Sequence, residues 1–236
     1  MESEKVSTVY SLSLIHICTG GDIDLSVGYV ATLVAVLSAQ ILKGSNAQLW
    51  KAVLIAIAIG GVVGLINGLL VSYAKLPSLV VTMGMTSVVQ GIVNVYSSKY
   101  GVTGAPAPIL ATIANGKVGI VPNIIWLLLV VIVIATVILQ MTKIGVKLKS
   151  IGSNELAAFR CGLNVKVIRT CAFVASGVIA GLIGLLLLGN LGQAFKDMGS
   201  SYVMPSIAAV VVGGVSLKGG EANYINVCLL YTSRCV

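Results

Sequence analysis

The stretch that decides the fold class is residues 50–73, WKAVLIAIAIGGVVGLINGLLVSY, in which Lys51 is the single charged residue. A transmembrane helix needs about 20 apolar residues to cross the ~30 Å hydrocarbon core of a bilayer. The stretch is long enough for this, and it is about twice as long as the ~10-residue strands of an outer-membrane barrel. It therefore predicts a membrane-spanning α-helix.

The composition of the whole chain indicates the same class. Of the 236 residues, 57% are hydrophobic and only 9% are charged, whereas a soluble globular protein carries about 25% charged residues. So few charges cannot cover a globule of this size, which excludes a soluble enzyme, a disordered chain and a disulfide-stapled secreted domain. We predict an all-α polytopic membrane helix bundle.

Further apolar stretches extend this prediction to about six transmembrane helices. The last of them is short and contains Pro205, which predicts a kink or a preceding re-entrant piece. The third is the most polar. The six predicted spans are Leu25–Leu42, Trp50–Tyr73, Ser78–Tyr96, Asn123–Thr142, Thr170–Gly189 and Tyr202–Leu217.

The distribution of basic residues predicts the orientation of the bundle. Lys143–Arg169 holds six Lys and Arg residues against one acid, Glu155. Basic residues concentrate in cytoplasmic loops, so we expect this segment to be cytoplasmic. The net charge of +8 is explained by this bias and gives no reason to expect a nucleic-acid partner. Alternation then places Ala74–Pro77 and Lys218–Glu221 inside, and Lys43–Leu49, Ser97–Pro122 and Asn190–Ser201 outside.

Two series of glycines predict close helix packing. Gly60, Gly64 and Gly68 are spaced four residues apart, as are Gly177 and Gly181. Small residues at this spacing let two helix backbones approach closely in lipid. They indicate a compact bundle and do not identify a substrate.

Four stretches together resemble the permease family of bacterial ABC sugar importers, of the ribose, galactose and xylose type. The first is close to the family's GGIDLSVG, with one change near its start. Their order and spacing also fit the family, over about residues 19–222. The stretches are GGDIDLSVG (20–28), GLINGLL with LPSLVVTMG (64–70 and 76–84), IGSNELAA with GLNV (151–158 and 162–165), and IAAVVVGGVSLKGG (207–220).

The resemblance also divides the chain. Members of the family have about ten helices, with two before the GGIDLSVG stretch and about two after the final Gly-Gly, so the chain resembles an internal part of such a permease. Residues 1–18 and 228–236 belong to no predicted span, and we expect both to be foreign sequence. Residues 19–227 are then the permease domain, with 143–169 as its cytoplasmic coupling loop.

The basic loop contains a short predicted helix. Asn154 can cap a helix over Glu155–Cys161, and Gly162 can end it. Leu156, Phe159 and Leu163 then form one apolar stripe. By itself this pattern leaves two partners open, an anionic lipid surface or a groove on another protein. The resemblance implies that this helix couples the permease to an ATPase subunit, through Asn154, Glu155, Leu156, Ala157, Ala158, Phe159 and Gly162.

Two further groups of polar residues are candidates for a role in transport. Asp22 and Asp24 precede the first span and are interpreted as helix-capping acids or, alternatively, as part of a gate. Polar uncharged residues inside the spans could line a path for a sugar, since amides both donate and accept hydrogen bonds; hydrogen bonding between helices is the alternative. These lining candidates are Asn67, Thr82, Gln90, Asn94 and Ser176.

The sequence has no phosphate-binding GxxxxGK[ST] motif, so we predict that it does not hydrolyse ATP itself. No cofactor or metal site is indicated, because the five cysteines form no CxxC pair and His16 has no ligand set around it. The resemblance implies an ATPase subunit, a periplasmic or lipid-anchored sugar-binding protein and a second permease subunit as partners, in the bacterial inner membrane. The predicted function is monosaccharide import, of a ribose-like pentose or a hexose, by alternating access.

Three alternatives remain beside this prediction. A membrane scaffold that transports nothing would explain the glycine packing but not the coupling-loop motif. A branched-chain amino-acid-type ABC permease would share the architecture, and the GGDIDLSVG stretch argues for sugars instead. A gradient-driven carrier would need an ionisable residue inside a span, and none of the six predicted spans contains an acid.

Overall fold

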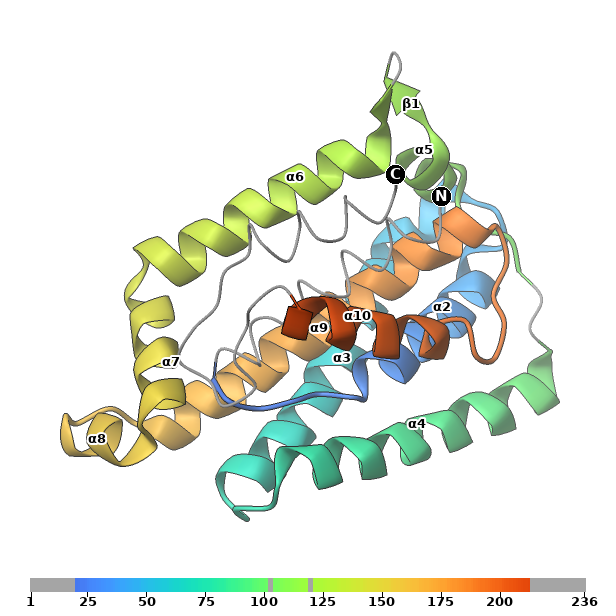
Figure 1. The fold of residues 1–236 in the computed structure, drawn as a ribbon. Helices are drawn as coiled ribbons and strands as arrows, with labels where there is room; N and C mark the ends of the chain where they lie inside the picture. The colour runs from blue at the N-terminus through green and yellow to red at the C-terminus, as the bar shows by residue number, and fades with distance from the viewer. Residues whose placement is uncertain (1–19, 102–103, 119–120, 213–236) are drawn as a thin grey trace.

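The computed structural model describes residues 20–101, 104–118 and 121–212 (Figure 1). Helices dominate this part of the chain and confirm the all-α prediction, beside one two-residue antiparallel ribbon. The elements are α2 (Val27–Leu42), η1 (Asn46–Gln48), α3 (Leu49–Ser72), α4 (Ser78–Tyr100), α5 (Pro108–Asn115), β1 (Lys117–Val118), β2 (Val121–Pro122), α6 (Asn123–Thr136), η2 (Val137–Met141), α7 (Lys143–Ser153), α8 (Glu155–Arg160), α9 (Val165–Leu191) and α10 (Ser200–Val212).

Three helices in the described part are long and apolar enough to cross a membrane. They are Asn46–Ser72, which joins η1 to α3, then α4, and then α9, with mean hydropathies of 2.5, 1.5 and 2.5. The helix α2 is shorter, at 16 residues, and an extended segment precedes it. Each of the six predicted spans is mostly helical where the structure describes it, but the helix bounds differ from the predicted ones.

The predicted span Asn123–Thr142 is not one regular helix. Its α-helical part ends at Thr136, and a π-helical turn over Val137–Met141 leads into α7. The predicted span Tyr202–Leu217 corresponds to α10, which begins at Ser200, and residues 213–217 lie outside the described part. Three other predicted segments, 1–18, Lys218–Glu221 and 228–236, also lie outside it.

The glycine prediction is confirmed by the packing of α3 against α9. The two helices run antiparallel, and a Cβ on Gly60 would lie 2.1 Å from the carbonyl oxygen of Gly177. A Cβ on Gly64 would lie 2.4 Å from that of Phe173. Only glycine allows backbones to approach so closely at these positions. The two series of glycines therefore meet each other across one interface.

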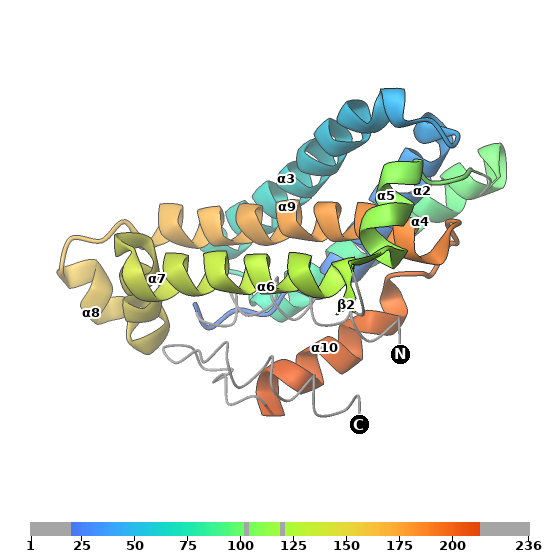
Figure 2. The ribbon, with the colours of Figure 1, turned by 90° about the horizontal axis from the view of Figure 1, so that it is seen from above.

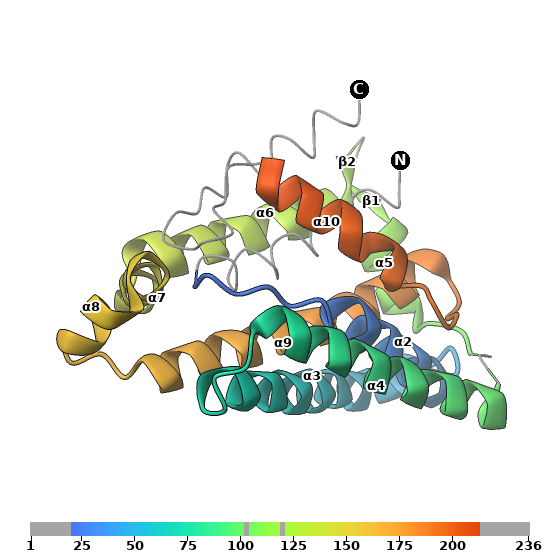
Figure 3. The same ribbon diagram turned by 60° about the horizontal axis from the view of Figure 1, so that its bottom comes forward.

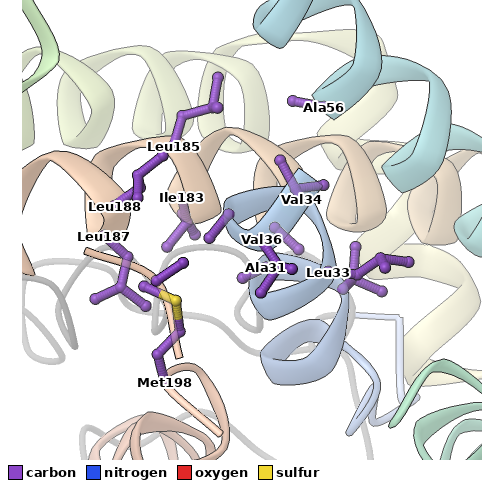
Figure 4. Close-up of a cluster of buried hydrophobic side chains, with 14 of the residues drawn as sticks. Ala31, Leu33, Val34, Val36, Ala56, Ile183, Leu185, Leu187, Leu188 and Met198 are labelled. Atoms are coloured by element: carbon purple, nitrogen blue, oxygen red, sulfur yellow. The ribbon is translucent and has the colours of Figure 1, made fainter. Parts of the chain in front are cut away.

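The helix α2 is at the centre of the bundle. Figure 3 shows α2 and α9 between α10 on one side and α3 and α4 on the other. Its apolar side chains are buried on all sides, and Figure 4 shows Ala31 and Val34 among Ile183 and Leu188 of α9. Because α2 is enclosed by protein, the extended backbone that precedes it can lie inside the bundle without exposure to lipid.

The described loops gather at two ends of the molecule, as the predicted alternation requires. At one end, Gly44 N donates to Ala105 O at 3.1 Å, and the Asn115 amide donates to Gly189 O at 3.2 Å. At the opposite end, α7 and α8 lie beside the start of α9 (Figure 2). That the second end faces the cytoplasm remains a prediction from its basic charge.

Two helices, α5 and α7, were not predicted. Residues 97–122 were expected to be an external loop, yet Pro108–Asn115 forms α5, with Pro108 in its first turn. Leu110 of α5 packs against Gly189, where a Cβ would lie 2.6 Å from the Leu110 carbonyl oxygen. Proline fits the first turn of a helix because its missing N–H has no partner there in any case.

Candidate functional site

The extended segment before α2, residues 20–26, forms one part of the candidate site. Helix α2 begins at Val27 with Ser26 at its N-cap, two residues later than predicted, and its first turn contains no acid. The interpretation of Asp22 and Asp24 as caps of this helix is therefore wrong. Asp24 instead accepts hydrogen bonds from the backbone N and the Oγ of Ser26, at 2.9 and 2.6 Å.

Asp24 is buried, although it lies outside the membrane-spanning helices. Burial raises the pKa of its carboxyl group to about 6, and the two hydrogen bonds from Ser26 partly oppose this rise. Burial has this effect because it disfavours the charged form of a carboxyl group.

Asp22 is also buried, and it has a charged partner. Arg169, in the second turn of α9, donates from Nε and Nη2 to the two carboxylate oxygens of Asp22, at 2.5 and 2.7 Å. The Nη1 of Arg169 also lies 3.5 Å from Glu155 Oε2. Bidentate pairs between an arginine and a carboxylate are among the strongest hydrogen-bonded contacts in proteins.

Two of the lining candidates lie against this segment. Asn67 of α3 donates from Nδ2 to Ser26 Oγ at 3.0 Å. Thr82 of α4 donates from Oγ1 to the carbonyl oxygens of Ile23 and Ser78, at 3.2 and 2.9 Å. Asn67 is fully buried, and its Oδ1 has no hydrogen-bond partner among the described residues. The structure thus places Asn67, Thr82 and the segment 20–26 together.

The other three lining candidates are not part of this group. Gln90 and Asn94 are eight and twelve residues beyond Thr82 on α4, which is about 12 and 18 Å along the helix axis. Gln90 is half-buried and Asn94 is exposed. Ser176 is buried in the interior of α9.

The second part of the candidate site is α8. Asn154 is its N-cap, and the Asn154 side chain accepts a hydrogen bond from Ala157 N at 2.9 Å. Gly162 has a φ of +82°, and Leu163 N donates to Ala158 O at 3.2 Å. This is the glycine-terminated helix end predicted from the sequence.

The predicted apolar stripe of α8 divides into two faces. Ala158 is buried with Ile151 of α7 and Val165 of α9, and Leu163 packs against this cluster. Leu156 and Phe159 point away from it and are 61% and 67% exposed. They line a cavity of about 1010 Å³ together with Gly162, Leu163 and Lys166, among others. In the described part of the chain, two large apolar side chains of α8 are thus mostly exposed beside a cavity.

Two further candidate functional residues, Ser26 and Arg169, were not predicted from the sequence. Ser26 lies within the GGDIDLSVG stretch, and its hydroxyl joins Asp24 to Asn67, a role that the local sequence does not indicate. Arg169 was counted only as one of the basic residues of the loop. Its position at the edge of a predicted span was the one available signal, since a charge so near the membrane usually has a partner.

The fold and these sites define the class of protein. It is a polytopic α-helical membrane protein whose central helix is preceded by a buried polar segment. Residues 6–223 match the family described as branched-chain amino acid transport system / permease component. The chain belongs to this family of ABC importer permeases, as predicted, and is a multi-pass protein of the bacterial inner membrane. Members of the family are transport components rather than enzymes.

Several similar proteins are permeases named for sugars. The chain is 30% identical to a ribose import permease protein of Haemophilus influenzae, over 94% of this chain and 70% of that protein. It is 31% identical to a galactose/methyl galactoside import permease protein of Escherichia coli, over 96% and 73%. A D-allose transport system permease protein of Escherichia coli is 30% identical over 88% and 63%. No solved structure matches the chain.

Proposed function

We propose that the chain is the membrane-spanning subunit of an ABC importer that carries a monosaccharide, a ribose-like pentose or a hexose, by alternating access. A separate ATPase subunit hydrolyses ATP, a periplasmic or lipid-anchored binding protein delivers the sugar, and a second permease subunit completes the pathway. The names of the similar proteins, for ribose, galactose and allose, support a monosaccharide.

The observation that carries this proposal is the exposed pair Leu156 and Phe159. A capped helix of six residues, fixed by the Ile151–Ala158–Val165 cluster, presents two large apolar side chains beside a cavity of about 1010 Å³. An amphipathic helix of this kind can insert its apolar side chains into a groove of a partner protein. We assign that groove to the ATPase subunit, so that α8 and its flanks, from Asn154 to Gly162, form the coupling element.

Replacing Phe159 with Asp tests this assignment. Burial of a Phe side chain at an interface contributes about 1.5–3 kcal/mol, and a loss of about 3 kcal/mol weakens binding more than a hundredfold. Because Phe159 lies outside the membrane-spanning helices, Phe159→Asp should still insert into the membrane. We expect that the ATPase subunit no longer co-purifies with this variant in detergent.

Val146→Asp is the matched control. Val146 is on α7, is 59% exposed and is not among the residues that line the cavity beside α8. This variant introduces the same charge near the same end of the bundle and should keep the ATPase subunit. If Phe159→Asp co-purifies with the ATPase subunit as the parental chain does, α8 is not the coupling element and its apolar face lies on lipid.

We also propose that the sugar passes the polar group around residues 20–26. The open Oδ1 of Asn67 is a hydrogen-bond acceptor without a partner in the described part of the chain, and a sugar hydroxyl is a suitable donor. The neighbouring Asp22 and Asp24 then belong to a gate near the inner end of the path. The more distant Gln90, Asn94 and Ser176 remain candidates for other parts of the path.

A further inference from the structure

The ion pairs of Arg169 join three parts of the chain that are distant in sequence. Its guanidinium group forms two hydrogen bonds with Asp22, at 2.5 and 2.7 Å, and lies 3.5 Å from the carboxylate of Glu155. Asp22 is in the segment before α2, Arg169 is in α9, and Glu155 is the first residue of α8. One side chain therefore connects α8 directly to the buried segment 20–26.

The two halves of this connection differ in strength. The side chain of Asp22 is 4% exposed and is held at two points, whereas Glu155 is 62% exposed and makes one long contact. A buried two-pronged pair is costly to break because it would leave a buried charge without a partner. An exposed single contact contributes little and forms or breaks easily. The Asp22 half is thus the permanent one, and the Glu155 half is able to switch.

The segment 20–26, which contains Asp22, is hydrogen-bonded to two membrane-spanning helices. Ile23 N donates to Ser78 Oγ at 3.4 Å, and Ile23 O accepts from Thr82, so the segment is bound to α4. Ser26 is bound to Asn67 of α3. A shift of Arg169 relative to the bundle would therefore reach both helices through these three hydrogen bonds.

The surrounding cavities place this connection between the two candidate sites. A polar cavity of about 510 Å³ is lined by Asp22, Glu155 and Arg169 together with Ser72, Ser78 and others. Glu155, Lys75 and Lys166 line this cavity and also the larger one beside Leu156 and Phe159. The ion-pair group, which consists of Asp22, Glu155 and Arg169, thus lies between the surface beside α8 and the segment 20–26.

We propose that Arg169 is a positioning residue that transmits movement of α8 to the segment 20–26. When α8 moves, the contact between Arg169 and Glu155 forms or breaks, and the permanent pair with Asp22 carries the displacement into the bundle. This inference rests on the proposed function, because it assumes that α8 is moved by an ATPase subunit.

Arg169→Lys tests the inference in the importer reconstituted in proteoliposomes. Lysine keeps the positive charge but lacks the planar guanidinium, so it cannot hold Asp22 at two points and contact Glu155 at once. We expect the ATPase subunit to co-purify and ATP to be hydrolysed, while the number of sugar molecules imported per ATP falls at least tenfold. Lys147→Gln, on the exposed face of α7, removes a charge from the same end and should leave this ratio unchanged.

A set of charge reversals separates coupling from simple stabilisation. Asp22→Arg with Arg169→Asp restores the buried pair but places two carboxylates together at Glu155. We expect this double variant to match the parental melting temperature more closely than Arg169→Asp alone and still to import poorly. Adding Glu155→Arg should restore the import ratio at least partly.

Three results would overturn the inference. They are a parental import ratio for Arg169→Lys, a parental ratio for the double reversal, and loss of the ATPase subunit or of folding in Arg169→Lys, which would make the residue purely structural. Failure of the proposed function itself gives a different result, since the parental chain would then show no ATP-dependent uptake at all.

Discussion

At the scale of single residues, the polar group before α2 is unusual for an apolar bundle. Asp24, Ser26 and Asn67 form one hydrogen-bonded chain that links the extended segment to α3. Polar side chains inside membrane proteins are costly and usually face a partner or a cavity. The sequence identified Asn67 as a polar residue in a span, but its partner could not be predicted, because Ser26 is 41 positions away.

Replacing Asn67 with Leu distinguishes a transport role from a structural one. The variant loses the hydrogen bond to Ser26, and such a bond contributes about 0.6 kcal/mol on average in a membrane protein. It also removes a buried acceptor, Asn67 Oδ1, that has no partner among the described residues. We therefore expect the melting temperature in detergent to change little, while the KM for sugar uptake rises.

Thr170→Val is the comparison variant, since Thr170 also joins α9 to α3, through hydrogen bonds to Gly68 and Ser72 that do not involve the segment 20–26. It should change uptake less than Asn67→Leu does. An unchanged KM for Asn67→Leu would remove Asn67 from the proposed path.

At the scale of elements, the antiparallel pair α3 and α9 organises the bundle. Its glycines could be recognised in the sequence because close helix packing in lipid requires small residues at regular spacing. The ends of α8 were predictable for a similar reason, since Asn154 and Gly162 act on neighbouring backbone groups. By contrast, α5 and the π-helical turn at Val137–Met141 depend on contacts with other parts of the chain, which local patterns do not contain.

Gly64→Ala should destabilise this pair. A Cβ at this position would lie 2.4 Å from the carbonyl oxygen of Phe173 and 2.9 Å from Val174 Cα, so backbone must move. Overpacking of this kind typically costs about 1–3 kcal/mol. We expect a clear fall in the apparent melting temperature measured in detergent.

Gly61→Ala, three residues earlier on the same helix, is the control for that measurement. The nearest atom to its Cβ would be Val178 Cγ2 at 3.7 Å, an ordinary contact. Alanine also favours a helix over glycine by up to about 1 kcal/mol. Equal destabilisation by Gly61→Ala and Gly64→Ala would contradict the packing account.

At the scale of the whole molecule, the loops divide between two ends, and the ion-pair group lies at the end that carries α7 and α8. Hydropathy and charge were sufficient to predict this division, since apolar stretches and clusters of basic residues can both be read directly from the sequence. Asp22 and Arg169 are 147 positions apart. Their contact could not be predicted, because the sequence around one residue does not indicate which distant residue it will contact.

Cysteine labelling tests which end faces the cytoplasm. In a background without the five native cysteines, Ser153→Cys should resist a membrane-impermeant thiol reagent in intact cells and Thr112→Cys should react. Both positions are exposed in the structure, so accessibility alone does not separate them. Labelling of position 153 in intact cells would contradict the predicted orientation.

The central claim is that this chain imports a monosaccharide with energy from a separate ATPase subunit. The most direct measurement is uptake of radiolabelled ribose, xylose and galactose into proteoliposomes that contain the chain, its ATPase subunit and its binding protein. We predict uptake of at least one of these sugars that requires ATP, the ATPase subunit and the binding protein together. Uptake driven by a proton or sodium gradient without the ATPase subunit would contradict the claim.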